Sequence, residues 1–177
     1  MASILMVAGE GLPFIKTGGL ADVIGSLPKA LTERGHEVKV VMPLYKKISD
    51  KYYNELHFDC EYSVSINYHE VPVRVFSKVV DDVCFFFIQH QGYFERDSLY
   101  GYQDDGERFG YFQKAVIEML NQLNYWPNII HCHDWHTGMI PCMVKETHDA
   151  DPRYRAIRFV YTCLLYTSDA ADEARSV

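Results

Sequence analysis

The chain has 177 residues, of which 48% are hydrophobic and 23% charged, a balance typical of one globular domain with a sizeable core. Its net charge is −7 without any Lys or Arg block, which argues against nonspecific nucleic-acid binding. No apolar run approaches the roughly 20 residues that span a bilayer, and no signal-peptide pattern is present. Five scattered cysteines without a CxxC motif indicate reduced thiols. We therefore expect a cytoplasmic protein that binds neither nucleic acid nor membrane.

The first forty residues predict a strand, a helix and a second strand. Residues 4–8 form a short apolar run, and residues 38–42 form another. Between them, apolar residues recur at spacings of three and four over residues 20–34, which indicates one face of a helix. Pro28 lies inside this pattern and is expected to kink the helix or to begin a second segment. The βαβ unit predicts a parallel sheet with a right-handed crossover.

The remaining chain continues the same class of fold. Residues 58–90 are rich in β-formers without a helical pattern, which predicts an antiparallel hairpin leading into a sheet strand at 83–88. The predicted elements beyond it are a helix at 106–124, a strand at 129–132, a helix at 137–148 and a strand at 157–161. The sequence thus predicts an α/β fold with a Rossmann-like parallel sheet and a β-hairpin insertion. Ligands of such sheets bind at the carboxyl ends of the strands.

A lysine and two glycines stand where the first predicted strand leads into the first helix, in the segment IKTGGL. Adjacent glycines at a helix start let the backbone approach a ligand closely. The free N–H groups and the helix dipole there favour an anion, commonly a phosphate. Lys16 adds a positive charge beside Gly18 and Gly19. An ordinary tight turn with a solvated lysine explains these residues equally well, so both interpretations stay open at this point.

The segment NIIHCHDWHTG, residues 128–138, holds three histidines, an aspartate and a tryptophan at a predicted strand end. His131, His133 and His136 suggest a zinc site, but the aspartate is displaced by one position from the order in metallo-β-lactamase-type hydrolases. A second interpretation makes some histidines hydrogen-bonded core residues and Asp134 the cap of the following helix. A third is a carbohydrate site, because Asp134 accepts from sugar hydroxyls while Trp135 offers a sugar face an apolar plate.

A second polar and aromatic stretch, residues 93–112, holds more functional side chains than a plain connecting loop needs. They are Arg96, Asp97, Tyr100, Tyr102, Asp104, Asp105 and Arg108. Tyrosine hydroxyls and paired carboxylates suit the recognition of polyols, whose hydroxyls both donate and accept. The alternative is a solvated loop in which Asp105 lies near the cap of the next helix.

Four motifs together resemble one family, the ADP-glucose-dependent bacterial glycogen and starch synthases of glycosyltransferase family five. In chain order they are KTGGLADVIGSLPKAL, MPLY, LYGYQDDGERFGYF and NIIHCHDWHTG, and the resemblance covers residues 1 to about 162. It implies the N-terminal half of a GT-B fold, in which two Rossmann-like domains face each other across a cleft. It also implies transfer of glucose from ADP-glucose to the non-reducing end of an α-1,4-glucan such as glycogen, with retention and without a bound metal or other cofactor.

The resemblance assigns roles to seven residues. The donor's phosphates or its glucose are expected to contact Lys16, Gly18 and Gly19. The side of the cleft where the glucan acceptor ends is expected to be lined by Asp22, Tyr100, Asp134 and Trp135.

The chain departs from the family near its last predicted strand. In the family this strand runs on as Tyr-Thr-Ile-His-Asn, and the histidine touches the sugar; here Leu164 stands at that position, which leaves the catalytic residue unknown. Residues 163–177 do not match the family and look like translated adaptor or frameshifted sequence. We therefore expect an incomplete domain over residues 1–162 and an unrelated tail over 163–177, with 170–177 poorly packed.

The missing partner of this domain is expected to be the enzyme's own C-terminal domain. The parent protein is expected to be a glucosyltransferase, while the chain alone is expected to be inactive. Two alternatives stay open: a non-catalytic glucan-binding module and, more distantly, a zinc hydrolase.

Overall fold

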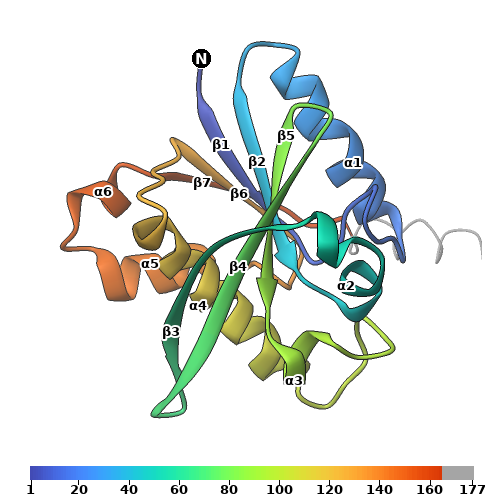
Figure 1. The fold of residues 1–177 in the computed structure, drawn as a ribbon. Helices are drawn as coiled ribbons and strands as arrows, with labels where there is room; N and C mark the ends of the chain where they lie inside the picture. Colours follow the sequence, from blue (N-terminus) through green and yellow to red (C-terminus); the bar gives the residue numbers. More distant parts are fainter. Residues whose placement is uncertain (165–177) are drawn as a thin grey trace, which may run out of the picture.

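The computed structural model describes residues 1–164; the segment 170–177, predicted to pack poorly, lies outside the described residues. Seven strands form one sheet in the order β3-β4-β5-β2-β1-β6-β7 (Figure 1). Their bounds are β1 Ser3–Val7, β2 Glu37–Pro43, β3 His57–Ile66, β4 His69–Val80, β5 Val83–Gln89, β6 Ile129–His133 and β7 Arg158–Thr162. The neighbouring strands β5, β2, β1, β6 and β7 run parallel to one another. β4 is antiparallel to both of its neighbours, β3 and β5.

The helices are α1 Gly19–Thr32, α2 Lys46–Tyr52, α3 Gln91–Phe94, α4 Asp105–Gln122, α5 Ile140–His148 and α6 Pro152–Arg155, with a 3₁₀ turn at Tyr53–Glu55. The chain builds the sheet outward from β1 to β5 and then returns to the other side of β1 through α4. Because crossover connections are right-handed, this reversal places α1 on one face and α4 and α5 on the other. Within residues 1–164 no helix has the length and apolar character to cross a bilayer.

The sheet is the parallel, Rossmann-like sheet with a hairpin insertion that the sequence predicts. Of the two outcomes predicted for Pro28, a second segment does not occur, because α1 continues through Pro28. One helix prediction needs correction. The helix predicted from residue 137 begins at Ile140, because Thr137 closes a turn: its N–H donates to Asp134 O (3.2 Å) and its hydroxyl to His133 O (2.8 Å).

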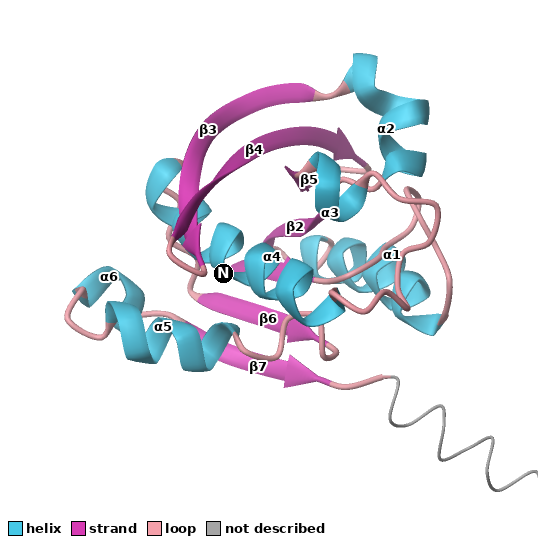
Figure 2. Ribbon diagram, turned by 90° about the horizontal axis from the view of Figure 1, so that it is seen from below, coloured by secondary structure: helices cyan, strands magenta, loops and turns pink. Residues whose placement is uncertain are grey.

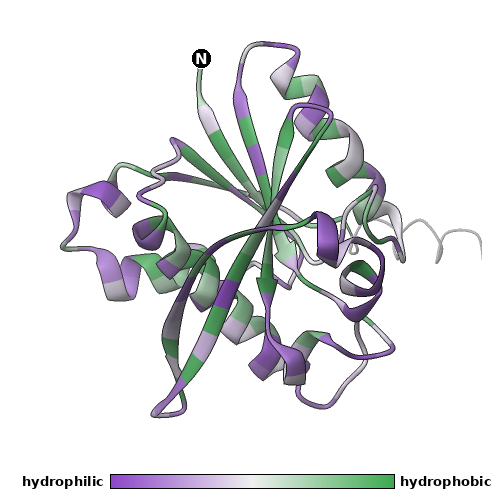
Figure 3. Ribbon diagram, viewed as in Figure 1, coloured by the Kyte–Doolittle hydropathy of each residue, from purple (hydrophilic) through white to green (hydrophobic). Residues whose placement is uncertain are grey.

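The apolar core surrounds the central strands, where the ribbon is largely green in Figure 3. Residues 5–7 of β1 are fully buried, as expected for a parallel strand that helices cover on both faces. Phe14, which follows β1 in the chain, packs edge-to-face on Phe85 and Phe87 of β5 at centroid distances of 5.0 and 4.8 Å. The core therefore also anchors the segment that leads from β1 into α1.

The β3–β4 hairpin curves over α4 (Figure 2). Tyr62 of β3 donates its hydroxyl hydrogen to Ala115 O of α4 at 2.5 Å. Tyr111 of α4 donates in turn to Pro72 O of β4 at 2.9 Å. These bonds fix α4, and so the start of that helix, against the hairpin insertion.

Replacing Tyr62 by Phe is expected to lower the free energy of unfolding by about 1 kcal/mol, because the buried carbonyl of Ala115 loses its side-chain donor. Urea unfolding followed by circular dichroism measures the change. The control is Tyr68→Phe, since Tyr68 lies fully exposed at the hairpin tip and should change stability little. Equal effects of the two substitutions would contradict a role for the Tyr62 hydroxyl in holding the hairpin.

Candidate functional site

Three loops meet at the carboxyl ends of β1 and β6. We call them the β1 loop (residues 8–18), the tyrosine loop (residues 95–104) and the β6 loop (residues 134–139). A Cβ added to Gly9 would lie 2.8 Å from His136 Cγ and 2.9 Å from the Tyr100 hydroxyl oxygen. Only glycine therefore fits where the β1 loop passes these two side chains. Gly9 O also accepts a hydrogen bond from the Tyr45 hydroxyl at 2.8 Å.

The glycines predicted to bind the donor lie at the start of α1. Gly18 is the N-cap residue in an extended conformation, without a side-chain capping bond, and α1 begins at Gly19. The first-turn N–H groups of a helix have no partner within the helix. A Cβ added to Gly19 would meet no described heavy atom within 4 Å. Packing therefore does not demand glycine at position 19.

Lys16 and Asp22, which the resemblance assigns to opposite substrates, form an ion pair with each other. Lys16 Nζ lies 2.6 and 2.7 Å from the two carboxylate oxygens of Asp22. The two side chains are 46% and 53% exposed, and such exposed pairs contribute little to stability. Donor-side and acceptor-side candidates are thus brought together at the first turn of α1.

Asp134 is fully buried and joins the ends of β6 and β7. Its N–H donates to Thr162 O at 2.9 Å, and its Oδ1 accepts the N–H of Leu164 at 2.6 Å. Its φ of 59° lies in the left-handed region that Asp tolerates better than most residues. The interpretation of Asp134 as a helix cap is wrong, because the N-cap of α5 is Met139.

The exposed aromatic surface of this edge centres on Trp135, which is 44% exposed. Its ring packs edge-to-face on Phe109 of α4 at 4.9 Å. Tyr100 lies beside it at 6.1 Å, and the Tyr100 ring also contacts His136 at 4.5 Å. Burial raises the pKa of Tyr100 far above its ordinary value, so its hydroxyl keeps its proton. The hydroxyl oxygen itself is buried beside Gly9 of the β1 loop. The structure therefore brings together Tyr100 and Trp135, two of the four residues predicted on the acceptor side.

The histidines of the β6 segment are neutral and largely packed into the fold. His133 and His136 are almost fully buried, and burial lowers the pKa of each to about 3. His131 bonds through Nε2 to the Thr162 hydroxyl at 2.8 Å. Among residues 1–164 no three His, Cys, Asp or Glu side chains gather as a metal site needs. The zinc-hydrolase alternative is therefore not favoured.

The tyrosine loop has several exposed residues, but charged side chains hold its conformation. Arg96 makes a two-pronged ion pair with Asp104 at 2.7 and 2.6 Å. Arg108 is fully buried and donates to Asp105 Oδ1 at 2.9 Å, while Asp105 Oδ2 accepts the N–H of Gly101 at 2.8 Å. Asp105 is the first residue of α4, directly after the N-cap Asp104, so it lies near the cap of this helix as predicted. The sequence could have predicted that Arg108 is buried, because Arg108 lies on the apolar face of this helix.

Glu10 is also charged and buried, but unlike Arg108 and Asp134 it stands outside the motifs singled out in the sequence. It is 3% exposed, and its Oε2 accepts both the N–H and the hydroxyl of Thr17 at 2.5 and 2.7 Å. Its position directly after the first apolar strand was the available signal, because residues there line the ligand edge of a parallel sheet.

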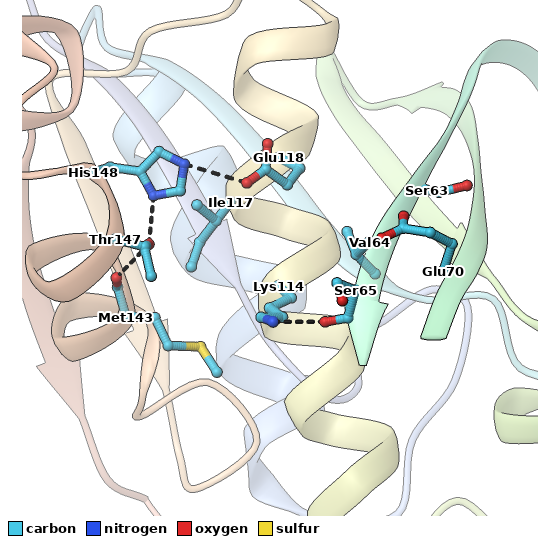
Figure 4. A pocket seen from close by; sticks show the side chains of 10 residues that line it. All are labelled: Ser63, Val64, Ser65, Glu70, Lys114, Ile117, Glu118, Met143, Thr147 and His148. Carbon is cyan, nitrogen blue, oxygen red and sulfur yellow. Dashed lines mark hydrogen bonds and ion pairs between the residues drawn. The ribbon is translucent and has the colours of Figure 1, made fainter. Parts of the chain in front are cut away.

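The cavity shown in Figure 4 lies away from this edge, between the β3–β4 hairpin, α4 and α5. Its volume is about 330 Å³. Lys114 donates to Ser65 O at 2.6 Å, and His148 lies 3.2 Å from a Glu118 carboxylate oxygen. Its lining includes none of the residues predicted to bind substrate, and these charged groups already have protein partners. We therefore place the candidate site at the carboxyl edge of the sheet.

A sequence model of the starch synthase catalytic domain matches residues 3–164. The chain belongs to this family. The glycogen synthase of Clostridium kluyveri is 45% identical over 159 residues, which are 90% of this chain and 34% of that protein. The glycogen synthase of Desulforamulus reducens is 42% identical over 159 residues, or 90% of this chain and 33% of that protein. The chain thus spans about a third of the length of these relatives.

A solved structure shows the same fold. The catalytic domain of starch synthase IV from Arabidopsis thaliana, bound to ADP and acarbose, matches with a TM-score of 0.80 at 32% identity. The match covers 92% of this chain and 34% of that chain. The resemblance seen in the sequence motifs is therefore confirmed, and so is the fold class, part of a GT-B glycosyltransferase.

The free energy of unfolding is expected to fall as the pH drops from about 6.5 toward 3, because His133 and His136 are neutral in the fold. In the unfolded chain each regains an ordinary pKa near 6.5, so the unfolded state binds more protons and acid favours it. The expected loss by pH 5 is about 2 kcal/mol per histidine.

Urea unfolding at pH 7 and pH 5 measures this loss. Carboxylates also destabilise proteins in acid, so imidazole proton resonances recorded over the same range supply the control. Two histidines should stay neutral at pH 5. Titration of every histidine near pH 6.5 would contradict their burial.

Proposed function

We propose that this chain supplies the substrate-binding edge of one of two facing domains in an ADP-glucose-dependent glycogen synthase. The complete enzyme transfers glucose from ADP-glucose to the 4-hydroxyl at the non-reducing end of an α-1,4-glucan, with retention and without a bound metal. The observation that carries the proposal is the meeting at Gly9 of the β1 loop, which leads into α1, with the side chains of Tyr100 and His136. One edge thereby presents an anion site and an aromatic sugar site together.

The donor's phosphates are proposed to bind where α1 begins. The N–H groups of Gly18 and Gly19 and the positive end of the helix dipole attract an anion there. Space is open at Gly19, so a phosphate can approach the backbone closely. The ion pair of Lys16 with Asp22 is exposed and weak enough for a diphosphate to replace the carboxylate. Lys16 and these N–H groups then stabilise the departing ADP.

The glucan end is proposed to lie against Trp135 and Tyr100. The exposed face of Trp135 offers an apolar plate to a sugar ring, and the ring of Tyr100 lies beside it. Asp22, once Lys16 turns to the donor, is left with acceptor oxygens at the same edge. Asp134 contributes by holding the backbone of Leu164 through its Oδ1. ADP in the Arabidopsis structure is the leaving group of the proposed donor, which supports this arrangement.

The chain alone is proposed not to transfer glucose. Leu164 stands where the family has a histidine that touches the sugar, and an aliphatic side chain makes no polar contact there. The second domain, which closes the cleft over the nucleotide, is not part of the 177 residues. We further propose that the domain ends within a few residues of position 162, since the family match runs to residue 164, and that the rest of the chain is a tail outside it.

The function is tested with a chimera that joins residues 1–162 to the part of the Clostridium kluyveri glycogen synthase that follows the matched region. We expect ADP release from ADP-glucose that depends on glycogen for the chimera and none for the 177-residue chain. The relative's own enzyme serves as the positive control. A folded chimera without activity would overturn the proposed function, and glycogen-dependent release by the chain alone would show that the catalytic groups are misplaced.

Replacing Trp135 by Ala is expected to weaken retention of the 177-residue chain by glycogen roughly fivefold, because an exposed aromatic plate is lost. Affinity electrophoresis in gels with increasing glycogen measures the apparent dissociation constant. The control is Tyr68→Ala, which removes an exposed aromatic ring from the hairpin tip and should change nothing. If glycogen retained the unsubstituted 177-residue chain as tightly as the chimera, the glucan-binding module would be favoured over the synthase fragment.

A further inference from the structure

Glu10 and Thr17 tie the two ends of the β1 loop together. Glu10 is 3% exposed, and one oxygen of its carboxylate accepts the N–H and the hydroxyl of Thr17 at 2.5 and 2.7 Å. Bonds to a charged acceptor are stronger than neutral ones. Thr17 lies between Lys16 and Gly18 in the chain, so this contact fixes the segment proposed to hold the donor phosphates.

Other backbone bonds stiffen the same loop from within. Gly11 N–H donates to Ile15 O at 3.1 Å, and Leu12 N–H donates to Ala21 O of α1 at 3.1 Å. The Glu10 contact closes the last stretch of the loop, directly before the N-cap Gly18. The loop bonds therefore end directly before Gly18 and Gly19, where α1 begins and where the first-turn N–H groups have no partner within the helix.

The negative charge of Glu10 lies close to the proposed phosphate site, so Glu10 cannot assist phosphate binding through its charge. A Cβ added to Gly18 would lie 3.7 Å from Glu10 Oε1, so the carboxylate sits beside the proposed phosphate site. Negative charge there opposes the binding of an anion. Within residues 1–164, no ion pair includes Glu10. The contacts that offset its burial are those with Thr17.

We propose that Glu10 is a positioning residue for the donor site: it engages the N–H and hydroxyl of Thr17 and thereby orients the Gly18 and Gly19 N–H groups toward the phosphates. This inference rests on the proposed function. We assign Glu10 no contact with the donor, because its own hydrogen bonds go to Thr17 and a carboxylate repels a phosphate. It improves anion binding through geometry although its own charge opposes it.

Because the geometry and the charge of Glu10 act on ADP binding in opposite directions, the direction of the change in affinity distinguishes the two effects. Glu10→Ala removes both the acceptor and the charge, whereas Glu10→Gln keeps an acceptor oxygen for Thr17 and removes only the charge. If Glu10 acts by position, the alanine variant binds ADP more weakly and the glutamine variant binds it as well as or better than the parent. If only charge matters, both variants bind ADP more tightly.

The experiment measures the dissociation constant of the 177-residue chain for ADP by isothermal titration. Hydrogen exchange of the Thr17 amide is measured in the same proteins without ligand. We expect Glu10→Ala to weaken ADP binding about tenfold and to speed exchange of the Thr17 amide. Glu10→Gln should stay within about twofold of the parent in both measurements or bind ADP more tightly.

Two further variants separate positioning from a loss of stability. Gln113 is 4% exposed, and its Oε1 accepts the N–H of Met139 at 2.7 Å. Gln113→Ala therefore removes a comparable buried acceptor and should leave ADP binding unchanged. Thr17→Val removes only the hydroxyl bond and should weaken ADP binding about threefold, which keeps the test valid if Glu10→Ala does not fold.

Tighter ADP binding by Glu10→Ala, or unchanged exchange of the Thr17 amide in that variant, would overturn the inference. An equal loss of ADP affinity in Gln113→Ala would reduce the role of Glu10 to stability and would also overturn it. Absence of ADP binding by the parent would instead overturn the proposed donor site. In that case the exchange rates still decide whether Glu10 holds the turn.

Discussion

β1 lies between β2 and β6, and the chain changes its direction along the sheet at this strand. The loops that follow β1 and β6 therefore leave the same edge of the sheet side by side and contact each other. Gly9 makes their contact possible, because a methyl group at this position would collide with His136 and Tyr100. The helix start that suits a phosphate and the aromatic residues that suit a sugar are adjacent for this reason. The proposed donor and acceptor surfaces follow from this one packing constraint.

Carboxylate side chains, two of them buried and one half-buried, hold each of the three loops by bonds to the backbone. Glu10 holds Thr17, Asp105 holds Gly101, and Asp134 holds Leu164. A carboxylate in such a place is costly to bury unless it accepts strong hydrogen bonds, so each of these contacts fixes a particular loop conformation. The exposed groups, Lys16 and Trp135, stand on segments that are already rigid. Binding then needs little additional ordering of the backbone, which favours affinity.

The sequence predicts the sheet well, because buried parallel strands are short apolar runs with glycine stops and the long helices show a clear apolar periodicity. It does not predict α2, α3 and α6, whose few residues carry too little periodicity. It also misplaces Asp134, since a side chain that caps a helix and one that joins two strand ends look alike in sequence. The contact of Glu10 with Thr17 joins one side chain to a loop backbone and leaves no repeating pattern. The grouping of Lys16 with Asp22 likewise depends on the path of the β1 loop.

Amide chemical shifts of the isotopically labelled chain, mapped as ADP is added, show directly whether the start of α1 holds the donor's phosphates as proposed. We expect the largest changes at Gly18, Gly19 and Leu20, with smaller changes around Lys16. Changes concentrated instead around Ser65 and Lys114, which line the cavity between the hairpin and α4, would exclude phosphate binding at the start of α1.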